Sequence, residues 1–184
     1  MLIGDYMNSV TWWAKTKADP DAFHTWLTKQ YIGECTAEVR IRNIAKMANN
    51  PIHSVILDRI ADDEAKHAEW VADLLMWYKV ALPVIDIEAS QQRYWKEVLP
   101  SISSVFDAYA VGAHAETMRL SRIQAIVDDT AKDPYYEKVW VVFSGILPDE
   151  QFHAKAFAVM AGPEALSKNL PNHQRGLEVL GLES

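Results

Sequence analysis

The sequence predicts an all-α protein, a bundle of four long helices, and two observations lead to this prediction. Helix breakers are scarce, because 184 residues include only 7 glycines and 8 prolines. Most of the prolines also divide the chain into long uninterrupted blocks. Proline is tolerated in the first turn of a helix and disrupts its interior, so these prolines are expected to mark element boundaries. They are Pro20, Pro51, Pro83, Pro100, Pro134 and Pro163.

The first two helices are expected to form a hairpin. The first spans about 20–49, with Asp19 as its N-cap, because Asp accepts hydrogen bonds from the free N–H groups of a first turn. The second begins at Pro51 and continues to about Leu82. Each helix has about 30 residues, which is enough for one side of a bundle.

A second hairpin is expected from the next two blocks. The third helix begins at Pro100 and continues to about Thr130, and the fourth spans about 134–161 with Asp133 as its cap. Pro148 falls inside the fourth block and is expected to kink that helix or loosen its hydrogen bonding.

The remaining segments are expected to pack on a single domain spanning residues 1–184. Its core is about 20–161, and residues 1–19 and 162–184 lie against it, the latter as short helical pieces. Residues 83–100 contain EASQQRYWKEVL, which predicts a short helix. This connection could extend to roughly 60 Å at most, enough to run the length of the bundle.

Charge and composition exclude several classes of function. The chain carries a formal charge of −7 and has a pI near 5.3, without the basic stripe of a nucleic-acid-binding protein. No apolar run approaches the roughly 20 residues that span a bilayer, so no membrane partner is expected and the expected location is the cytoplasm. Cys35 is the single cysteine, which excludes an internal disulfide and any CxxC metal module.

The chemistry is indicated by a D-E-x-x-H motif that occurs twice, at residues 63–67 and 149–153. Residues three apart in a helix lie on one face, so Glu64 and His67 can converge on one metal ion, and so can Glu150 and His153. One such pair alone would more often be a solvated surface pair. The repetition favours a metal site.

Each of the other two helices offers a glutamate at a matching height. Glu34 precedes Glu64 by 30 residues and Glu116 precedes Glu150 by 34, so the second hairpin repeats the first. At 1.5 Å per residue, each member of a pair lies about 20 Å from the turn between its helices. Apolar residues share the stripe of every one of these glutamates, which places them on the core side.

Four buried carboxylates repel one another and lose their hydration, at a cost of several kcal/mol each, unless they take up protons or cations. Two divalent ions would balance them. Oxygen and nitrogen ligands without sulfur suit iron or manganese. The sequence therefore predicts a centre with two Fe ions, with Mn or a mixed Mn/Fe pair as alternatives.

These residues resemble a known family. With GECTAEVRIRNIAKMA at 33–48 and DDEAKHAEW at 62–70, the chain resembles the ferritin-like di-iron carboxylate superfamily over about residues 20–160, and rubrerythrin-type sequences in particular. The superfamily also includes the ribonucleotide reductase small subunit and di-iron oxygenases. The resemblance implies a ferritin-like four-helix bundle with a long crossover between helices 2 and 3. It implies the metal ligands Glu34, Glu64, His67, Glu116, Glu150 and His153.

The resemblance also implies how the imidazoles are oriented. Relatives with D-E-x-x-H bond each aspartate to the histidine of the opposite motif, which here pairs Asp63 with His153 and Asp149 with His67. The alternative is that both aspartates are surface acids. Tyr31, one turn before Glu34, is either a redox-active or hydrogen-bonding residue of the site or part of the core.

Such a site, once loaded, lets O2 or peroxide take electrons from two irons. The leading hypothesis is an oxidoreductase that activates O2 or peroxide, an oxygenase or oxidase of an unknown small organic substrate, fed by an external reductase. A homodimer is an expectation from the family. Glu38, one turn after Glu34, is an alternative ligand.

Three alternatives stay open. A ferroxidase or iron-storage protein of bacterioferritin type would also carry both histidines. A rubrerythrin-like peroxidase would need an external electron donor, since Cys35 alone cannot build a four-cysteine iron centre. Arg119 and Ala113 stand three residues either side of Glu116, where a rubrerythrin usually shows a second glutamate at one of the two positions. The third alternative is a structural bundle that binds no metal.

Overall fold

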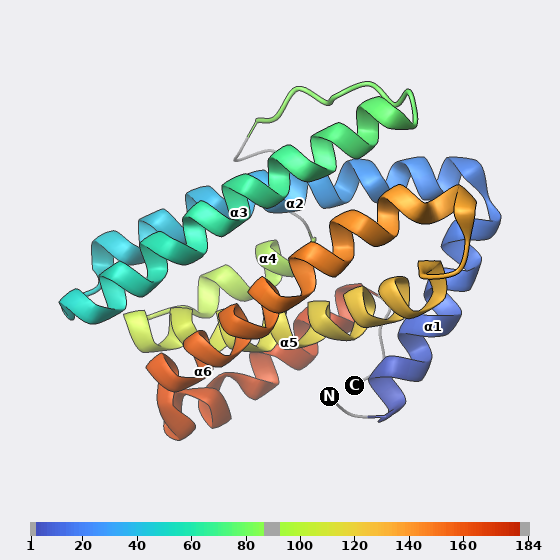
Figure 1. Cartoon of the computed structure of the whole chain (residues 1–184). Helices are drawn as coiled ribbons and strands as arrows, with labels where there is room; N and C mark the ends of the chain where they lie inside the picture. Colours follow the sequence, from blue (N-terminus) through green and yellow to red (C-terminus); the bar gives the residue numbers. More distant parts are fainter. Residues whose placement is uncertain (1–2, 87–92, 181–184) are drawn as a thin grey trace.

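A computed structural model describes residues 3–86 and 93–180 and shows a bundle of four long helices (Figure 1). These are α2 (Pro20–Met47), α3 (Pro51–Trp77), α5 (Val105–Thr130) and α6 (Glu137–Val179). Shorter elements are α1 (Ile3–Ala18), α4 (Arg93–Val98) and two 3₁₀ turns, η1 (Leu99–Ser101) and η2 (Pro134–Tyr136). No strand occurs in the described part of the chain. The all-α prediction is confirmed.

The topology is that of a ferritin-like bundle. Helices α2 and α3 form one antiparallel hairpin, and α5 and α6 form the other (Figure 1). Helices α3 and α5 run in the same direction, so the connection between them must return along the bundle, as the predicted long crossover does. Of the short helix expected in this crossover, residues 93–98 are helical; residues 87–92 lie outside the described part.

Local capping chemistry explains where the first hairpin begins and ends. The Asp19 carboxylate accepts the backbone N–H of Asp21 at 2.9 Å, as predicted. Helix α3 ends at Trp77 rather than near Leu82, because Lys79 adopts a left-handed backbone with φ 57. The Val80 N–H then donates to the Leu75 carbonyl at 2.8 Å, which closes the helix end.

The second hairpin departs further from the predicted boundaries. Helix α5 begins at Val105 instead of Pro100, because Ser104 is the N-cap and its hydroxyl accepts the Asp107 N–H at 3.1 Å. Helix α6 keeps helical backbone angles through Pro148 and breaks only at Gly162, with φ 73 and ψ 164. This conformation is essentially restricted to glycine.

Beyond Gly162 the chain folds back along the bundle as one helical arm, residues 163–179, and not as the short pieces that were expected (Figure 1). The arm continues through Pro171, and polar contacts hold it on α5. The Asn169 amide donates to Asp107 at 2.8 Å, and Lys168 pairs with the same carboxylate at 2.9 Å. A side chain at Gly176 would meet the Tyr94 ring, so glycine allows the arm to pack closely on α4.

The two largest of three hydrophobic clusters lie toward opposite ends of the bundle. The first is rich in aromatic rings and includes Trp13 and Trp26, whose centroids are 4.9 Å apart. The second is largely aliphatic and includes Ile41, Leu57 and Ile60. Buried glutamates and histidines lie on the stretches of helix between these clusters.

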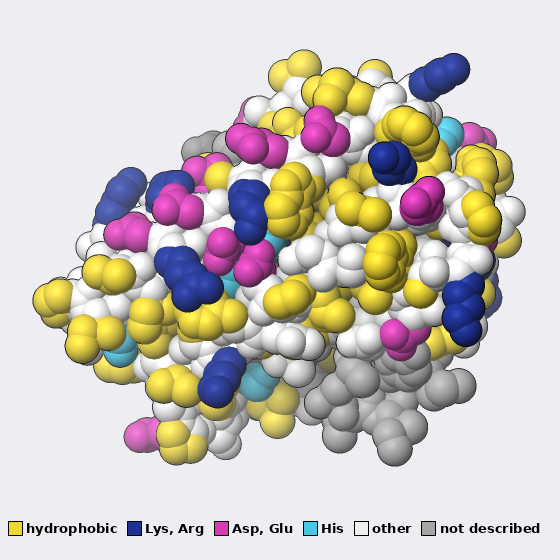
Figure 2. Space-filling model, viewed as in Figure 1, with side chains coloured by type: hydrophobic (Ala, Val, Ile, Leu, Met, Phe, Trp, Pro, Cys, Tyr) yellow, Lys and Arg dark blue, Asp and Glu magenta, His cyan; other side chains and the backbone are white. Residues whose placement is uncertain are grey.

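On the face viewed in Figure 2, acidic and basic side chains lie next to one another among hydrophobic ones. None of the described helices is long and apolar enough to cross a membrane.

Candidate metal centre

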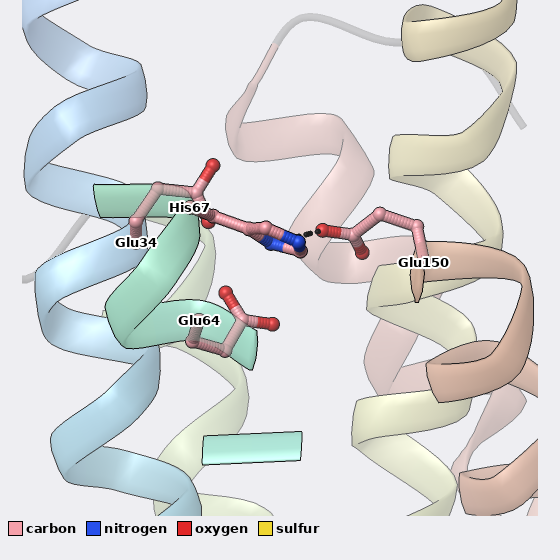
Figure 3. Close-up of side chains that lie close together, drawn as sticks. All are labelled: Glu34, Glu64, His67 and Glu150. Atoms are coloured by element: carbon pink, nitrogen blue, oxygen red, sulfur yellow. Dashed lines mark ion pairs between the residues drawn. The ribbon is translucent and has the colours of Figure 1, made fainter. Parts of the chain in front are cut away.

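Three helices bring four predicted ligands together at mid-height in the bundle (Figure 3). Glu34 projects from α2, Glu64 and His67 from α3, and Glu150 from α6. One ligand atom of each lies within 4.8 Å of the others, and all four side chains are fully buried. This separation is compatible with side chains that share bound cations.

The remaining two predicted ligands lie beside this group. The Nδ1 atom of His153 is 3.3 Å from Oε1 of Glu64 and 3.8 Å from Oε2 of Glu150. Glu116, on α5, is the least enclosed of the six, with 7% of its surface exposed. Burial and the neighbouring Glu150 raise the pKa of Glu116 to about 8. The structure therefore places all six around one interior region.

The two D-E-x-x-H motifs are tied to each other crosswise. Nε2 of His67 is 3.2 Å from Oδ2 of Asp149, and Nε2 of His153 is 3.4 Å from Oδ2 of Asp63. An imidazole whose Nε2–H donates to a carboxylate presents Nδ1 as a ligand. Nδ1 of His67 indeed faces the site, 3.6 Å from Oε1 of Glu150 (Figure 3). The geometry has the crossed pairing expected from the resemblance.

Arg119 is the residue of the site whose role the sequence did not reveal. Its guanidinium is ion-paired with Glu34 and lies 3.2 Å from Glu150 and 3.6 Å from Glu64. Burial lowers the pKa of Arg119, but these carboxylates raise it by more, so the group stays charged. Arg119 thus supplies one positive charge to a region that holds four glutamates.

One guanidinium does not balance the charge of four glutamates, and the pKa values of neighbouring groups shift accordingly. Burial, opposed by Arg119, raises the pKa of Glu34 to about 7. Burial lowers the pKa of His153, yet the attraction of Glu150 and Glu64 raises it to about 11. These shifts mean that the carboxylates draw protons in order to balance their charge. A divalent cation would satisfy the same demand.

The donor atoms themselves fit a metal. Among the described residues, several buried atoms of the site have no hydrogen-bond partner. They are Oε2 of Glu34, both carboxylate oxygens of Glu64 and of Glu150, and Nδ1 of His67 and of His153. Buried polar atoms are normally hydrogen-bonded, so a group of buried oxygens and nitrogens without hydrogen-bond partners indicates a cation site.

Comparison with known proteins shows which family matches the part of the chain that carries these ligands. A family model described as Rubrerythrin matches residues 26–161, a range that contains all six predicted ligands. The chain belongs to the rubrerythrin family. No curated protein and no solved structure matches it. The predicted ferritin-like resemblance is therefore confirmed at the level of the rubrerythrin family, a branch of the di-iron superfamily.

Other residues singled out from the sequence lie outside the metal group. Glu38 accepts a hydrogen bond from Arg42 at 3.0 Å and is thereby held on the outer side of α2, which argues against it as a ligand. Tyr31 is half-buried beside the half-buried Cys35, and burial raises the pKa of both. Tyr31 packs against the aromatic cluster, and its redox role stays a prediction.

Proposed function

We propose that this rubrerythrin-family protein is a di-iron oxidoreductase that activates O2 or peroxide and acts on a small organic substrate. The observation that carries the proposal is the set of buried carboxylate oxygens and imidazole nitrogens that have no hydrogen-bond partner and face one another from three helices. When bound, a pair of irons would supply two electrons to oxygen or peroxide. An external reductase would restore them.

The chain's own residues contribute orientation, charge and shielding. Asp149 and Asp63 orient His67 and His153, so that each Nδ1 faces the carboxylates. Glu34, Glu64 and Glu150 are fully buried, and this excludes bulk water from most of the site. Low polarity strengthens the interaction of these ligands with a cation.

A peroxidase is the second candidate function, because the matching family model is that of rubrerythrin. Arg119 argues for the oxidase or oxygenase, since it stands three residues after Glu116, where a second carboxylate is expected in a rubrerythrin. A guanidinium at that position cannot serve as an alternative metal ligand.

The test begins with anaerobic titration of Fe(II) into the chelator-treated protein. We expect two irons per chain, followed on exposure to air by near-ultraviolet absorption from ferric iron. Rapid mixing with O2 in one arm and H2O2 in the other compares the two candidates: a faster reaction with O2 favours the oxidase or oxygenase, and a faster reaction with H2O2 favours the peroxidase. Uptake of many more than two irons per chain would instead support iron storage. Failure to bind about two irons would contradict the proposal.

A further inference from the structure

A cavity lies between α2 and α5, beside α4 and the turn that follows it. These two helices pack on each other less closely than the helices within either hairpin. The space has a volume of about 400 Å³, within the range of roughly 300–1,000 Å³ that is typical of small-molecule sites. Most of its lining is apolar, with Ile41, Ile44, Leu99 and Phe157 among the contributing side chains. It can therefore accommodate an apolar body.

The inner wall of this cavity reaches the metal centre. Glu116 lines it, and Glu116 is the one predicted glutamate ligand that is not fully enclosed. Gly112, one turn before Glu116, also lines it, and a methyl group there would come within 3.0 Å of the Phe157 ring. Glycine at this position lets Phe157 lie against α5, where a larger residue would displace its ring. A molecule in the cavity would thus lie next to the candidate metal centre.

The cavity also contains a cation, Arg40, which forms no ion pair with a described carboxylate, although Glu116 and Glu64 attract it from a greater distance. The Arg40 guanidinium stacks on the Trp95 ring at 3.6 Å from its centroid, and Nη1 donates to the Thr36 carbonyl at 3.5 Å. Within residues 3–86 and 93–180, no carboxylate lies within ion-pairing distance of Arg40. Burial, opposed by Glu116 and Glu64, lowers the pKa of Arg40 to about 10, so Arg40 stays charged at neutral pH.

Removing a guanidinium from water costs free energy unless an anion pairs with it, and the planar N–H donors of arginine match a carboxylate. We propose that the cavity binds a carboxylic acid with an apolar tail, with the carboxylate on Arg40 and the tail between α2 and α5. This inference rests on the proposed function, because it names the substrate class of the same site. It predicts that both the charge of the head group and the width of the cavity control binding.

The experiment measures binding to the chelator-treated full chain by calorimetry, with octanoate as the probe and 1-octanol and octylamine as matched ligands. We expect octanoate to bind at least about 10-fold more tightly than either, since a pair of charge-assisted hydrogen bonds is worth more than about 1.4 kcal/mol. Equal affinities for octanoate and octanol would overturn the proposal.

Variants of Arg40 test whether octanoate binds in this cavity. Arg40→Gln should lower octanoate affinity about 10-fold and leave octanol binding within about 2-fold, whereas Arg40→Lys should retain part of the preference. Arg42→Gln is the matched control, because Arg42 lies on the same helix and pairs with Glu38 and Asp62 at the surface. It should change neither affinity. An equal effect of Arg40→Gln and Arg42→Gln would contradict the proposal.

A second variant tests the apolar part without removing a buried charge. Val39 lines the cavity and is 36% exposed, so Val39→Trp should narrow the cavity and leave the fold intact. Both octanoate and octanol should then bind several-fold more weakly. Unchanged binding would place the ligand elsewhere and refute the inference.

These measurements need no iron, so their failure can be separated from that of the proposed function. If iron loads and is oxidised but octanoate does not bind, only the inference about the substrate fails. If octanoate binds as described but the protein does not load iron, the proposed function fails and the cavity stands as a binding site.

Discussion

The two hairpins carry the same pattern of ligands but differ three residues after the single glutamate. In α2 this position is Ala37, which is 4% exposed and belongs to the aliphatic core. In α5 it is Arg119, whose guanidinium reaches Glu34 and Glu64 of the other hairpin. The comparison indicates that the repeated motif supplies a nearly symmetrical donor set. Among the described residues, the cation that forms ion pairs with these glutamates, Arg119, comes from the second hairpin.

The two hairpins also differ in how accessible their single glutamates are. Glu34 is fully enclosed, whereas its counterpart Glu116 borders the cavity between α2 and α5. The second hairpin also continues past Gly162 into the arm that packs on α4. The shared features would thus bind metal, and the features of the second hairpin would control charge and entry.

The largest effect is expected from removing a carboxylate ligand of the motif that both hairpins share. Glu64→Gln and Glu150→Gln should each weaken metal binding by roughly 100-fold or more, since each removes a ligand and its charge, whereas loss of a group that only orients a ligand costs about 10–100-fold. Calorimetry with Co(II) or Fe(II) measures the affinity. Glu38→Gln is the control. A loss in only one of the two ligand variants would show that the hairpins are not equivalent.

The next effect tests the cation that distinguishes the second hairpin. Arg119→Gln leaves three buried carboxylates without their partner, so the chelator-treated protein should lose about 3 kcal/mol of unfolding free energy. Metal affinity should rise, because the metal no longer competes with the guanidinium. Denaturant unfolding with and without Co(II) measures both.

Arg122→Gln is the control for this variant. Arg122 lies one turn further along α5, with its guanidinium 5.3 Å from the Trp12 ring centroid and away from the carboxylates. An equal loss of stability in the two variants, or an Arg119→Gln protein with weaker metal binding, would contradict a role for Arg119 as counter-ion.

A smaller effect compares the crossed aspartates. Asp63→Ala and Asp149→Ala should each lower metal affinity about 10–100-fold, because the histidine of the opposite motif loses the partner that orients it. Asp62→Ala is the control, since Asp62 is exposed and pairs with Arg42. Metal titration of all three variants is the measurement. Loss of affinity equal to that of Asp62→Ala would mean that the pairs do not orient the ligands.

The smallest effect concerns the arm that only the second hairpin has. Nδ1 of His173 lies at hydrogen-bonding distance, 2.8 Å, from the Tyr94 hydroxyl, and the His173 ring stacks on His114. Burial and then His114 lower the pKa of His173 to about 4 from 6.5 in an unfolded chain. The unfolded state therefore binds more protons between these values, so stability from His173 is present above pH 6.5 and is lost as the pH falls toward 4.

Hydrogen exchange checks this pH dependence. Amides of residues 163–179 should exchange faster as the pH falls from 6.5 to 4, after correction for the intrinsic rate, while those of α3 should change less. Denaturant unfolding of His173→Gln should show a weaker loss of stability over this interval than the original protein. Parallel curves for the two proteins would exclude His173 as the cause.

Some element boundaries were predictable because their causes are local. Asp19 and Asn50 each precede a proline and cap the helix that follows, and both helices begin where the sequence indicated. The end of α3 was not predictable in this way, since Lys79 is not a residue that normally marks a left-handed helix end. The predicted start of α5 at Pro100 was wrong, because Pro100 lies in the separate turn η1 and the helix is capped by Ser104.

In the candidate centre, too, features with a local cause were predictable and features that depend on other helices were not. The spacing of Glu64 and His67, and of Glu150 and His153, places each pair on one face of a helix, so their convergence could be expected. Arg119 was visible only as a departure from the rubrerythrin pattern. Its position three residues after Glu116 indicated a shared face, but its long side chain could equally have extended to solvent.

By itself, the sequence determined the all-α class, the duplicated hairpin and the six candidate ligands, because helix periodicity and the i, i+3 spacing are properties of a single segment. Only the tertiary structure decided that Arg119 lies among the carboxylates, that Glu116 borders a cavity, and that the chain folds back after Gly162. The reason is physical: where a flexible cation or an apolar gap comes to lie depends on the neighbouring helices, and the spacing of residues along one helix does not determine it.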